Sequence, residues 1–259
     1  MIEITAIQIE CLSKPNFQLD AFIRFLKANG QDWIKEGTLT EGDSLIEAAG
    51  RVCYMSFGKD RQSGKTNAEY IMHLIRQGHE SVLEHITWTF LLTGVSRAFT
   101  HQLVRHRVGF SYSQLSQQYH DESDASFVIP PAIAACPKAT KEWKNSIENS
   151  LSLYRKLISD VELDKHIGHE SKKERLRDLR SACRSILPNA TETKIVVTAN
   201  ARAIRHFFKM RGAIEGDWEM RAVACALFKQ VQVDAPGVFQ DFSISVSKDG
   251  SEKLVHESF

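Results

Sequence analysis

The sequence predicts an α+β fold, because it combines short strand patterns with longer helical ones. Residues 86–92 alternate threonine with apolar and aromatic side chains, and residues 194–198 form a short apolar, β-branched run. In contrast, residues 140–163 and 217–233 repeat apolar side chains at the spacing of a helix with one buried face. These patterns favour a sheet with flanking helices.

Further elements are expected in the first half of the chain. Isoleucines scattered over residues 2–9 predict a first strand, and residues 44–54 have an alanine-rich pattern typical of a helix. Asn67 is expected to cap a helix whose apolar stripe ends before Gly78. A helix over residues 96–107 is expected to begin at a serine and to carry many basic side chains.

The second half of the chain is predicted to be mainly helical. Residues 165–173 form a polar link between the helix at 140–163 and a further helix. Asn200 stands where the N-cap of a helix over residues 201–211 belongs, and Asp217 has the same role for the last helix. No repeat, low-complexity tract or linker marks a domain boundary.

The composition is that of an ordinary globular protein. Of the 259 residues, 42% are hydrophobic and 25% are charged, which excludes a mainly disordered chain. The formal net charge is +1, so no global electric field draws the chain to nucleic acid or to an acidic membrane. An anionic ligand must therefore be bound by a local cluster of cations.

The cysteine pattern favours a reducing compartment. The five cysteines are widely spaced and include no C-x-x-C pair, which disfavours a disulfide framework, a zinc ribbon or a thioredoxin motif. The first residues have no basic segment followed by an apolar one, and no run approaches the ~18 apolar residues of a membrane span. We expect a cytoplasmic protein without a membrane partner.

Two clusters of basic side chains are expected on helices that follow strands. Arginine and histidine are dense over residues 97–107 and again over residues 202–211. Clustered guanidinium groups repel one another unless anions neutralise them, and their planar fork suits bidentate contact with phosphate. A single cluster is better explained by a solvated basic face or by acidic neighbours than by a ligand. Two clusters with interleaved Ser, Asn and Gln favour a phosphorylated ligand.

The triplet Arg105-His106-Arg107, followed by Ser116, resembles the signature of flavin-dependent thymidylate synthases. The similarity is broader than this triplet. It includes Gly-His-Glu-Ser at 78–81, Leu-Pro-Asn-Ala-Thr at 187–191 and Asn-Ala-Arg at 200–202. These motifs lie in order between about residue 67 and residue 242, which makes chance similarity a poor explanation.

The resemblance implies one domain over residues 1–259, with a central sheet and flanking helices. It also implies site residues, position by position. The residues implied for FAD are Ser81, Arg105, His106, Arg107, Gln114, Asn200, Arg202 and His206. Those implied for the nucleotide are Gln102, Arg105, Gln114, Leu115, Ser116, Gln117, Gln118, Arg184 and Arg211.

The same resemblance implies a reaction. NADPH reduces FAD, methylenetetrahydrofolate supplies a one-carbon unit to C5 of the uracil of dUMP, and reducing equivalents from the flavin complete the methyl group of dTMP. Arg211 matches the catalytic arginine that polarises the uracil and helps to ionise N3. The family forms homotetramers with flavin sites between subunits, so these residues need not converge within one chain.

Two departures from the family pattern concern the nucleotide loop. Seven residues after Arg107 the chain reaches Leu115, so Ser116 requires one extra residue around Val108 or Gly109. In addition, Gln118 replaces the family's arginine, which removes a charged donor worth ~1.5–3 kcal/mol if it met phosphate. The altered loop leaves open a preference for UMP in place of dUMP.

Other chemistries have weaker support. No cysteine has a context that activates it as a nucleophile, and Ser116 has no visible His-Asp partners, so we expect it to bind through hydrogen bonds. His79 and His85 lack further metal ligands, and we expect no metal. The competing class is a non-enzymatic nucleic-acid-binding protein. Balanced charge and interleaved amides favour a bounded small-ligand site and no nucleic acid, and a yellow colour of the purified protein would discriminate.

Overall fold

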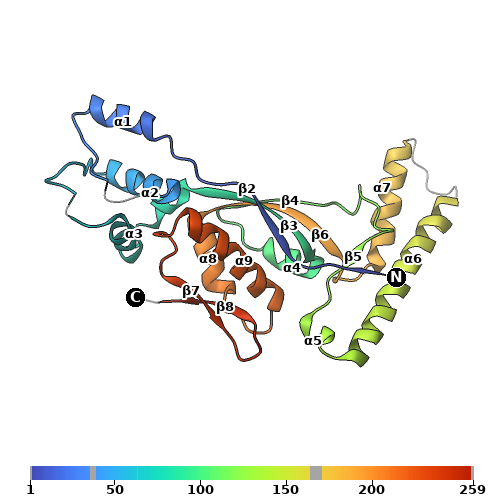
Figure 1. Ribbon diagram of the computed structural model, residues 1–259. Helices are drawn as coiled ribbons and strands as arrows, with labels where there is room; N and C mark the ends of the chain where they lie inside the picture. The colour runs from blue at the N-terminus through green and yellow to red at the C-terminus, as the bar shows by residue number, and fades with distance from the viewer. Residues whose placement is uncertain (1, 36–38, 63, 164–170, 258–259) are drawn as a thin grey trace. The chain divides into compact units, whose positions relative to one another are not determined.

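The computed structural model describes residues 2–35, 39–62, 64–163 and 171–257, which form the mixture of helices and strands shown in Figure 1. The predicted α+β class is confirmed. The chain divides into two compact units. Unit 1 contains Met1–Gln8, Leu91–Arg105 and Tyr112–Val196, and unit 2 contains Ile9–Phe90, His106–Ser111 and Val197–Phe259. One domain over residues 1–259 stays a prediction, and most of the expected polar link at 165–173 lies outside the described residues.

A four-stranded sheet has the strand order β2-β3-β6-β4. Its strands are β2 (Gln8–Ser13), β3 (Thr87–Ser96), β6 (Glu192–Asn200) and β4 (Phe110–Gln114). The strands predicted at 86–92 and 194–198 are present, and both extend further than expected. The predicted first strand at 2–9 is instead divided between β1 (Glu3–Ile4) and β2. The boundary between the two units falls within all four strands.

Unit 1 is mainly helical. Its helices are α4 (Arg97–Leu103), α5 (Pro131–Ala134), α6 (Pro137–Leu163), α7 (Lys172–Cys183) and the 3-10 turn η2 (Arg184–Ile186). β1 pairs in parallel with β5 (Ser126–Phe127). Ile147 and Leu151 of α6 pack on Phe127, while Tyr154 packs with Leu179 of α7. The apolar stripe predicted for 140–163 therefore does face a core.

The basic helix of unit 1 is shorter than its sequence predicted. Ser96 caps it as expected, because its hydroxyl accepts a hydrogen bond from the backbone N–H of Phe99 at 3.0 Å. The prediction that it continues to Arg107 is wrong, since α4 ends at Leu103. The hydroxyl of Tyr112 donates to the carbonyl of Leu103 at 2.9 Å and satisfies one of the carbonyls at the helix end.

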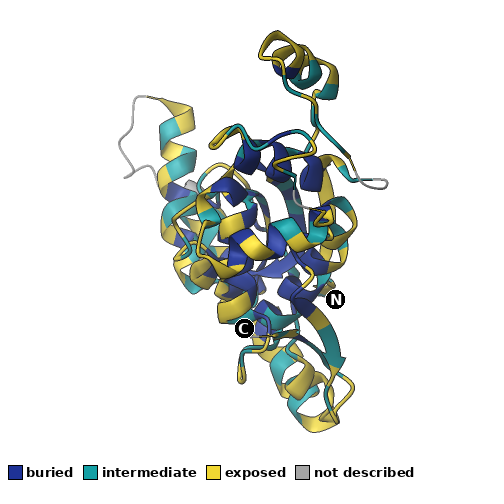
Figure 2. Ribbon diagram, turned by 90° about the vertical axis from the view of Figure 1, so that its left-hand side faces the viewer, coloured by how far each residue is buried: buried dark blue, intermediate teal, exposed yellow. Residues whose placement is uncertain are grey.

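Unit 2 holds the remaining helices and a hairpin. They are α1 (Leu19–Ala28), α2 (Glu41–Val52), α3 (Asn67–Arg76), the 3-10 helix η1 (Glu80–His85), α8 (Ala201–Arg211), α9 (Trp218–Asp234), β7 (Phe242–Val246) and β8 (Glu252–His256). Asp217 caps α9 as predicted. Figure 2 shows α8 and α9 with many buried residues and α1 with mostly exposed ones. No helix in the described ranges has the length and apolar character to span a bilayer.

Helix α8 begins and ends where the sequence predicted, at residues 201 and 211. Asn200 caps it, because its side-chain oxygen accepts a hydrogen bond from Ala203 N at 2.9 Å. On its buried face, Arg205 makes two contacts of 2.6 Å with the carboxylate of Asp241, and both side chains are almost fully buried. His256 of β8 contacts the same carboxylate at 3.0 Å. Removing Asp241 would leave a buried guanidinium uncompensated.

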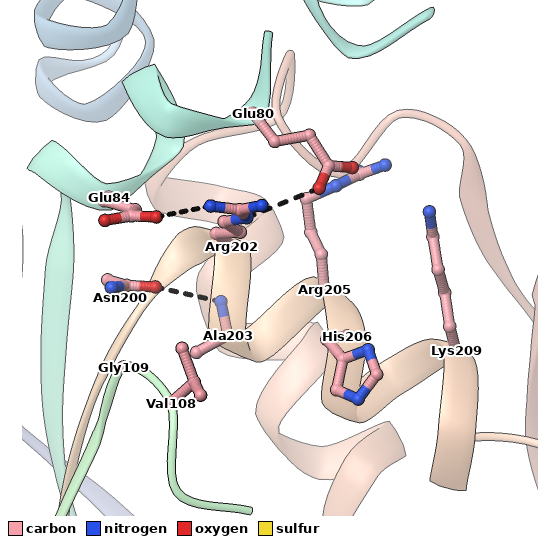
Figure 3. Close-up of a pocket in the computed structure, with 10 residues that line it drawn as sticks. All are labelled: Glu80, Glu84, Val108, Gly109, Asn200, Arg202, Ala203, Arg205, His206 and Lys209. Carbon is pink, nitrogen blue, oxygen red and sulfur yellow. Dashed lines mark hydrogen bonds and ion pairs between the residues drawn. The ribbon is translucent and has the colours of Figure 1, made fainter. Parts of the chain in front are cut away.

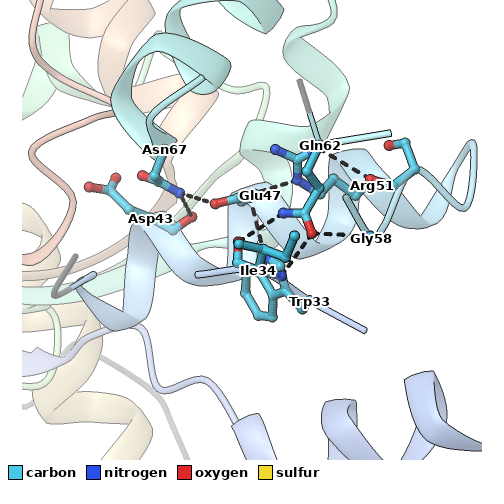
Figure 4. Close-up of polar contacts among 9 residues, drawn as sticks. Trp33, Ile34, Asp43, Glu47, Arg51, Gly58, Gln62 and Asn67 are labelled. Carbon is cyan, nitrogen blue, oxygen red and sulfur yellow. Dashed lines mark hydrogen bonds and ion pairs between the residues drawn. The ribbon is translucent and has the colours of Figure 1, made fainter. Parts of the chain in front are cut away.

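The predicted cap of α3 is wrong by one residue. Thr66 caps this helix, and Thr66 and Glu69 form a reciprocal capping box. The amide of Asn67 instead donates to the Glu47 carboxylate at 2.7 Å and to the Asp43 carbonyl at 3.2 Å (Figure 4). Glu47 also accepts a hydrogen bond from Arg51 at 2.6 Å, so this buried carboxylate is well satisfied.

The neighbouring carboxyl of Asp43 is in a less favourable environment. It is 4% exposed, and its Oδ2 accepts a hydrogen bond from Gly237 N at 2.9 Å. Burial raises the pKa of Asp43 to about 6, although hydrogen bonds from Gly237, Val238 and Thr40 act in the opposite direction. The fold therefore favours the neutral acid.

We predict that Asp43→Asn stabilises the protein at neutral pH. In wild type, the stability that the neutral Asp43 carboxyl contributes is fully present below the unfolded pKa of 3.8. It is lost as the pH rises through the folded pKa of about 6. The free energy of unfolding of the variant, relative to that of wild type, should therefore be on the order of 2–3 kcal/mol higher at pH 7.5 than at pH 4. Urea unfolding at both pH values measures this difference, with Asp60→Asn as an exposed control. An equal difference at both pH values would contradict the assignment.

Candidate functional site

Unit 2 contains an open cavity of about 500 Å³ beside the first turns of α8 (Figure 3). Its walls come from η1, from the loop before β4, and from β6 and α8. The lining residues are Glu80, Glu84, Val108, Gly109, Asn200, Arg202, Ala203, Arg205, His206 and Lys209. The volume is that of a typical small-molecule site, and the wall formed by α8 is rich in cationic and polar groups.

The guanidinium of Arg202 is neutralised by two carboxylates of η1. Its Nη1 donates to Glu84 Oε1 at 2.7 Å, and its Nε lies 3.5 Å from Glu80 Oε2. Arg202 and Glu84 are about half exposed, so these ion pairs are accessible to water and salt. An anionic ligand at this guanidinium must share it with Glu80 and Glu84.

Gly109 allows the loop before β4 to approach the start of α8. It has a φ of +73°, a left-handed conformation that favours glycine. A Cβ atom at this position would lie 2.8 Å from both Ala203 Cβ and Asn200 Nδ2. The carbonyl of Gly109 also accepts a hydrogen bond from Asn200 N at 3.2 Å. The loop that contains the extra residue of the motif is thus held directly against the N-cap of α8.

His106 and Arg211 form a direct contact across this unit. The Nε of Arg211 donates to His106 Nε2 at 3.1 Å. The imidazole also packs against the ring of Phe207, with 5.2 Å between centroids, and lies 6.2 Å from the ring of His206. Burial, Arg211 and His206 all lower the pKa of His106, so the neutral imidazole is favoured.

In unit 1 the loop after β4 is held by hydrogen bonds to its neighbours. The side-chain amide of Gln114 donates to the hydroxyls of Thr100 and Thr193, at 3.0 and 3.3 Å. Ser116 Oγ accepts a hydrogen bond from the backbone of Gln118 at 3.3 Å, which closes a short turn. This ordered loop presents both donors and acceptors.

The side-chain amide of Gln118 lies beside Arg177 and Ser181 of α7. Arg177 Nε donates to Gln118 Oε1 at 3.4 Å, and Gln118 Nε2 donates to Ser181 Oγ at the same distance. Arg177 also lies over the ring of Tyr119, 5.3 Å from its centroid. A guanidinium therefore stands next to position 118 even though the residue there is neutral.

Comparison with known proteins identifies the family. A family model described as thymidylate synthase complementing protein matches residues 37–237. The chain belongs to this family. Relatives named flavin-dependent thymidylate synthase support this: the protein of Mycobacteroides abscessus is 40% identical over 255 residues, which cover 98% of this chain and 97% of that protein. The protein of Mycobacterium sp. strain JLS is 44% identical over 82% of this chain and 84% of its own length. The resemblance predicted from the motifs is confirmed.

The residues that the motif resemblance implies for FAD mostly belong to unit 2. Asn200, Arg202 and His206 line the 500 Å³ cavity. His106 and Arg107 belong to the loop that supplies Val108 and Gly109, and Ser81 lies in η1 between the two lining glutamates, but these three are not among the lining residues. Arg105 and Gln114 belong to unit 1.

The residues implied for the nucleotide mostly belong to unit 1. Those in unit 1 are Gln102, Arg105, Gln114, Leu115, Ser116, Gln117, Gln118 and Arg184, and Arg211 belongs to unit 2. Arg97 was not assigned to the site from the sequence, yet its Nη2 donates to the carbonyl of Leu115 at 2.9 Å. Burial lowers the pKa of Arg97; the Glu122 carboxylate acts in the opposite direction, and the cation of Arg184 lowers the pKa further.

Sequence reasoning also missed several residues of the cavity. Glu80 and Glu84 belong to the motif region, but nothing in their spacing showed that both would face Arg202. Lys209 was visible only as part of a basic cluster. Among the described residues, no group of three or more His, Cys, Asp and Glu side chains is arranged to hold a metal ion.

We predict that Gly109→Ala destabilises the protein more than Gly58→Ala. Both glycines have positive φ, but a Cβ at Gly58 would meet nothing within 4 Å. The control should lose ~1–2 kcal/mol from backbone strain alone. Gly109→Ala should lose a further ~0.5–2 kcal/mol because it displaces the N-cap Asn200. Thermal unfolding measures both variants, and equal losses would argue against a role of Gly109 in placing the cap.

Proposed function

We propose that this protein is a flavin-dependent thymidylate synthase. It is a methyltransferase that converts dUMP to dTMP, with methylenetetrahydrofolate as carbon donor and NADPH as the reductant of FAD. The observation that carries this function is a family match over most of the chain, together with named relatives that align over almost its whole length. The nearly neutral charge gives the competing nucleic-acid-binding function no support.

The cavity of unit 2 fits part of an FAD molecule. Its volume of about 500 Å³ suits a large cofactor that extends beyond one chain. Arg202, His206 and Lys209 provide cationic or hydrogen-bonding groups toward a pyrophosphate, and the N-terminus of α8 adds its dipole. We propose that Asn200, Arg202 and His206 bind the cofactor, with Ser81, Arg105, His106, Arg107 and Gln114 completing its sites. When bound, FAD supplies the hydride chemistry of the reaction.

The nucleotide is proposed to lie against the loop after β4. Backbone and side-chain groups from Gln114 to Gln118 are ordered by hydrogen bonds and suit a pyrimidine and its sugar. Gln102, Arg105 and Arg184 add donors for a phosphate. The guanidinium of Arg211 is proposed to polarise a uracil carbonyl and to stabilise the negative charge that develops when N3 is ionised.

The assembly and location are also proposals. By analogy with the family, we propose a homotetramer in which subunits share the flavin sites. A cytoplasmic location rests on five free cysteines in a pattern that suits a reducing compartment. We propose neither a nucleic-acid nor a membrane partner.

We predict that Arg211→Lys separates chemistry from flavin binding. Lysine keeps the charge but loses the planar fork, so dTMP formation from dUMP should fall by at least ~10-fold while the flavin absorbance near ~450 nm remains.

A triple alanine variant at Asn200, Arg202 and His206 should keep its oligomeric state and purify colourless. Turnover and absorbance are measured on the same preparations.

Each outcome has a clear meaning. Unchanged turnover of Arg211→Lys would remove this residue from the mechanism. Full flavin occupancy in the triple variant would contradict the proposed cofactor site. A colourless wild-type protein that forms no dTMP with all three co-substrates would refute the function itself.

A second candidate substrate is favoured by Gln118. A neutral amide both donates and accepts, and so suits a ribose 2′-hydroxyl better than a cation does. An enzyme discriminates weakly between nucleotides that differ by one hydroxyl if its pocket only has room for that hydroxyl. Discrimination is strong if a buried polar side chain needs the hydroxyl as its hydrogen-bond partner. We therefore propose that UMP is methylated alongside dUMP.

Gln118→Arg is predicted to shift the preference toward dUMP. The measured quantity is the ratio of kcat/KM for dUMP to that for UMP, which should rise by at least ~3-fold because the amide proposed to meet the 2′-hydroxyl is lost. Gln232→Arg, on the exposed side of α9, adds the same charge away from the loop and should leave the ratio unchanged. A wild-type enzyme inert toward UMP while it turns over dUMP would leave thymidylate synthesis as the sole activity.

A further inference from the structure

The contact between His106 and Arg211 joins two motifs that lie far apart in the sequence. Arg211 Nε donates to His106 Nε2 at 3.1 Å, and both side chains are partly buried. His106 belongs to the Arg-His-Arg triplet in the loop before β4, and Arg211 is the last residue of α8. A hydrogen bond of this kind fixes the direction of the guanidinium plane.

The chemistry of the contact fixes the protonation state of the histidine. An arginine side chain has only donors, so the ring nitrogen that faces it must carry a lone pair. His106 is therefore neutral, with its proton on Nδ1. Protonation of Nε2 would remove the acceptor and bring two cations together.

The surroundings of the ring favour this neutral form. Phe207 and Phe110 pack around it, with ring centroids 5.2 and 6.1 Å away. The titratable or charged groups that face it from α8 are Arg211 and His206, and its chain neighbours Arg105 and Arg107 are also cationic. No carboxylate is among the groups that shift its pKa. The site is thus built to keep the imidazole uncharged.

The contact uses only one side of the guanidinium. In the part of the chain that the structure describes, His106 is the sole hydrogen-bond partner of the Arg211 side chain. Its Nη1 and Nη2 atoms form the planar fork that can address a carbonyl oxygen or another anionic group. A group that holds Nε and leaves the fork available presets the geometry of binding.

We propose that neutral His106 is the positioning residue for Arg211, and that its Nε2 lone pair aims the guanidinium fork at the pyrimidine. This inference rests on the proposed function, because it concerns the arginine assigned to the uracil. It gives the histidine of the triplet a role in the nucleotide reaction in addition to the role implied toward the flavin.

Two substitutions of His106 test the role. His106→Gln places a side-chain carbonyl oxygen near the position of Nε2 and retains an acceptor that does not titrate. His106→Phe retains the ring and removes the acceptor. His73→Phe, on the exposed face of α3, is the matched control for the loss of an imidazole in unit 2. All variants are assayed as holoenzymes, with rates expressed per bound flavin so that any loss of cofactor is counted separately.

We expect kcat per flavin to fall on the order of 10- to 100-fold in His106→Phe and to be largely restored in His106→Gln. In wild type, kcat should fall on the acid side as His106 gains a proton, and this acid limb should be absent in His106→Gln. The control should match wild type in both respects. Wild-type kcat per flavin in His106→Phe, or an acid limb that persists unchanged in His106→Gln, would overturn the proposal.

A spectroscopic measurement on wild type does not depend on activity or on the folding of a variant. In protein labelled with ¹⁵N-histidine and ¹⁵N-arginine, His106 should show an unprotonated Nε2 at neutral pH, and the Arg211 Nε–H signal should shift as His106 titrates. If the chemical shift of the Arg211 Nε–H signal does not change as His106 titrates, the inference is overturned. If the signals couple as expected but the enzyme forms no dTMP, the proposed function fails while the contact stands.

Discussion

The entry of the chain from β6 into α8 is the constraint on which the candidate site depends. Asn200 caps the helix through Ala203 N, its own N–H donates to Gly109, and Ala201 N donates to the carbonyl of Ile86. Three separate stretches of unit 2 are thereby fixed at one point. Because α8 starts there, the cavity side chains Arg202 and His206 fall one helical turn apart on the same face. Between them in the chain, Arg205 is held by its buried pair with Asp241, so the helix has little freedom to rotate.

Much of this arrangement is encoded locally and was predicted from the sequence. Asn200 before an apolar-periodic stretch and Gly212 after it define the limits of α8, and both limits are correct. The alternation around Trp88 and the apolar stripe around Leu151 predict a strand and a helix that the structure contains. These predictions succeed because capping and hydrophobic periodicity act within a few residues. The error at Asn67 was avoidable, since Thr66 and Glu69 have the spacing of a capping box.

What the sequence did not predict depends on contacts between distant residues. The early end of α4 is stabilised by Tyr112, which nothing in the helix itself indicates. The two carboxylates on Arg202 come from a 3-10 helix more than a hundred residues earlier, and the partner of Arg211 is 105 positions away. Such pairs require the topology of the fold before they can be inferred. The family resemblance named many of the same residues, but it did not indicate which of them contact one another.

The carboxylates around Arg202 have a consequence for the binding of anions. An arginine without carboxylate neighbours releases only weakly bound solution ions when it binds a phosphate. Arg202 must instead exchange its contacts with two carboxylates of the protein. Added salt weakens the resident ion pairs as well as the incoming contact, so the two effects partly cancel. The affinity of this cavity for a phosphorylated ligand therefore depends less on ionic strength than its number of cations suggests. Glu80 and Glu84 are fixed counterions of Arg202. They also disfavour the binding of small inorganic anions, which form no further contacts elsewhere in the cavity.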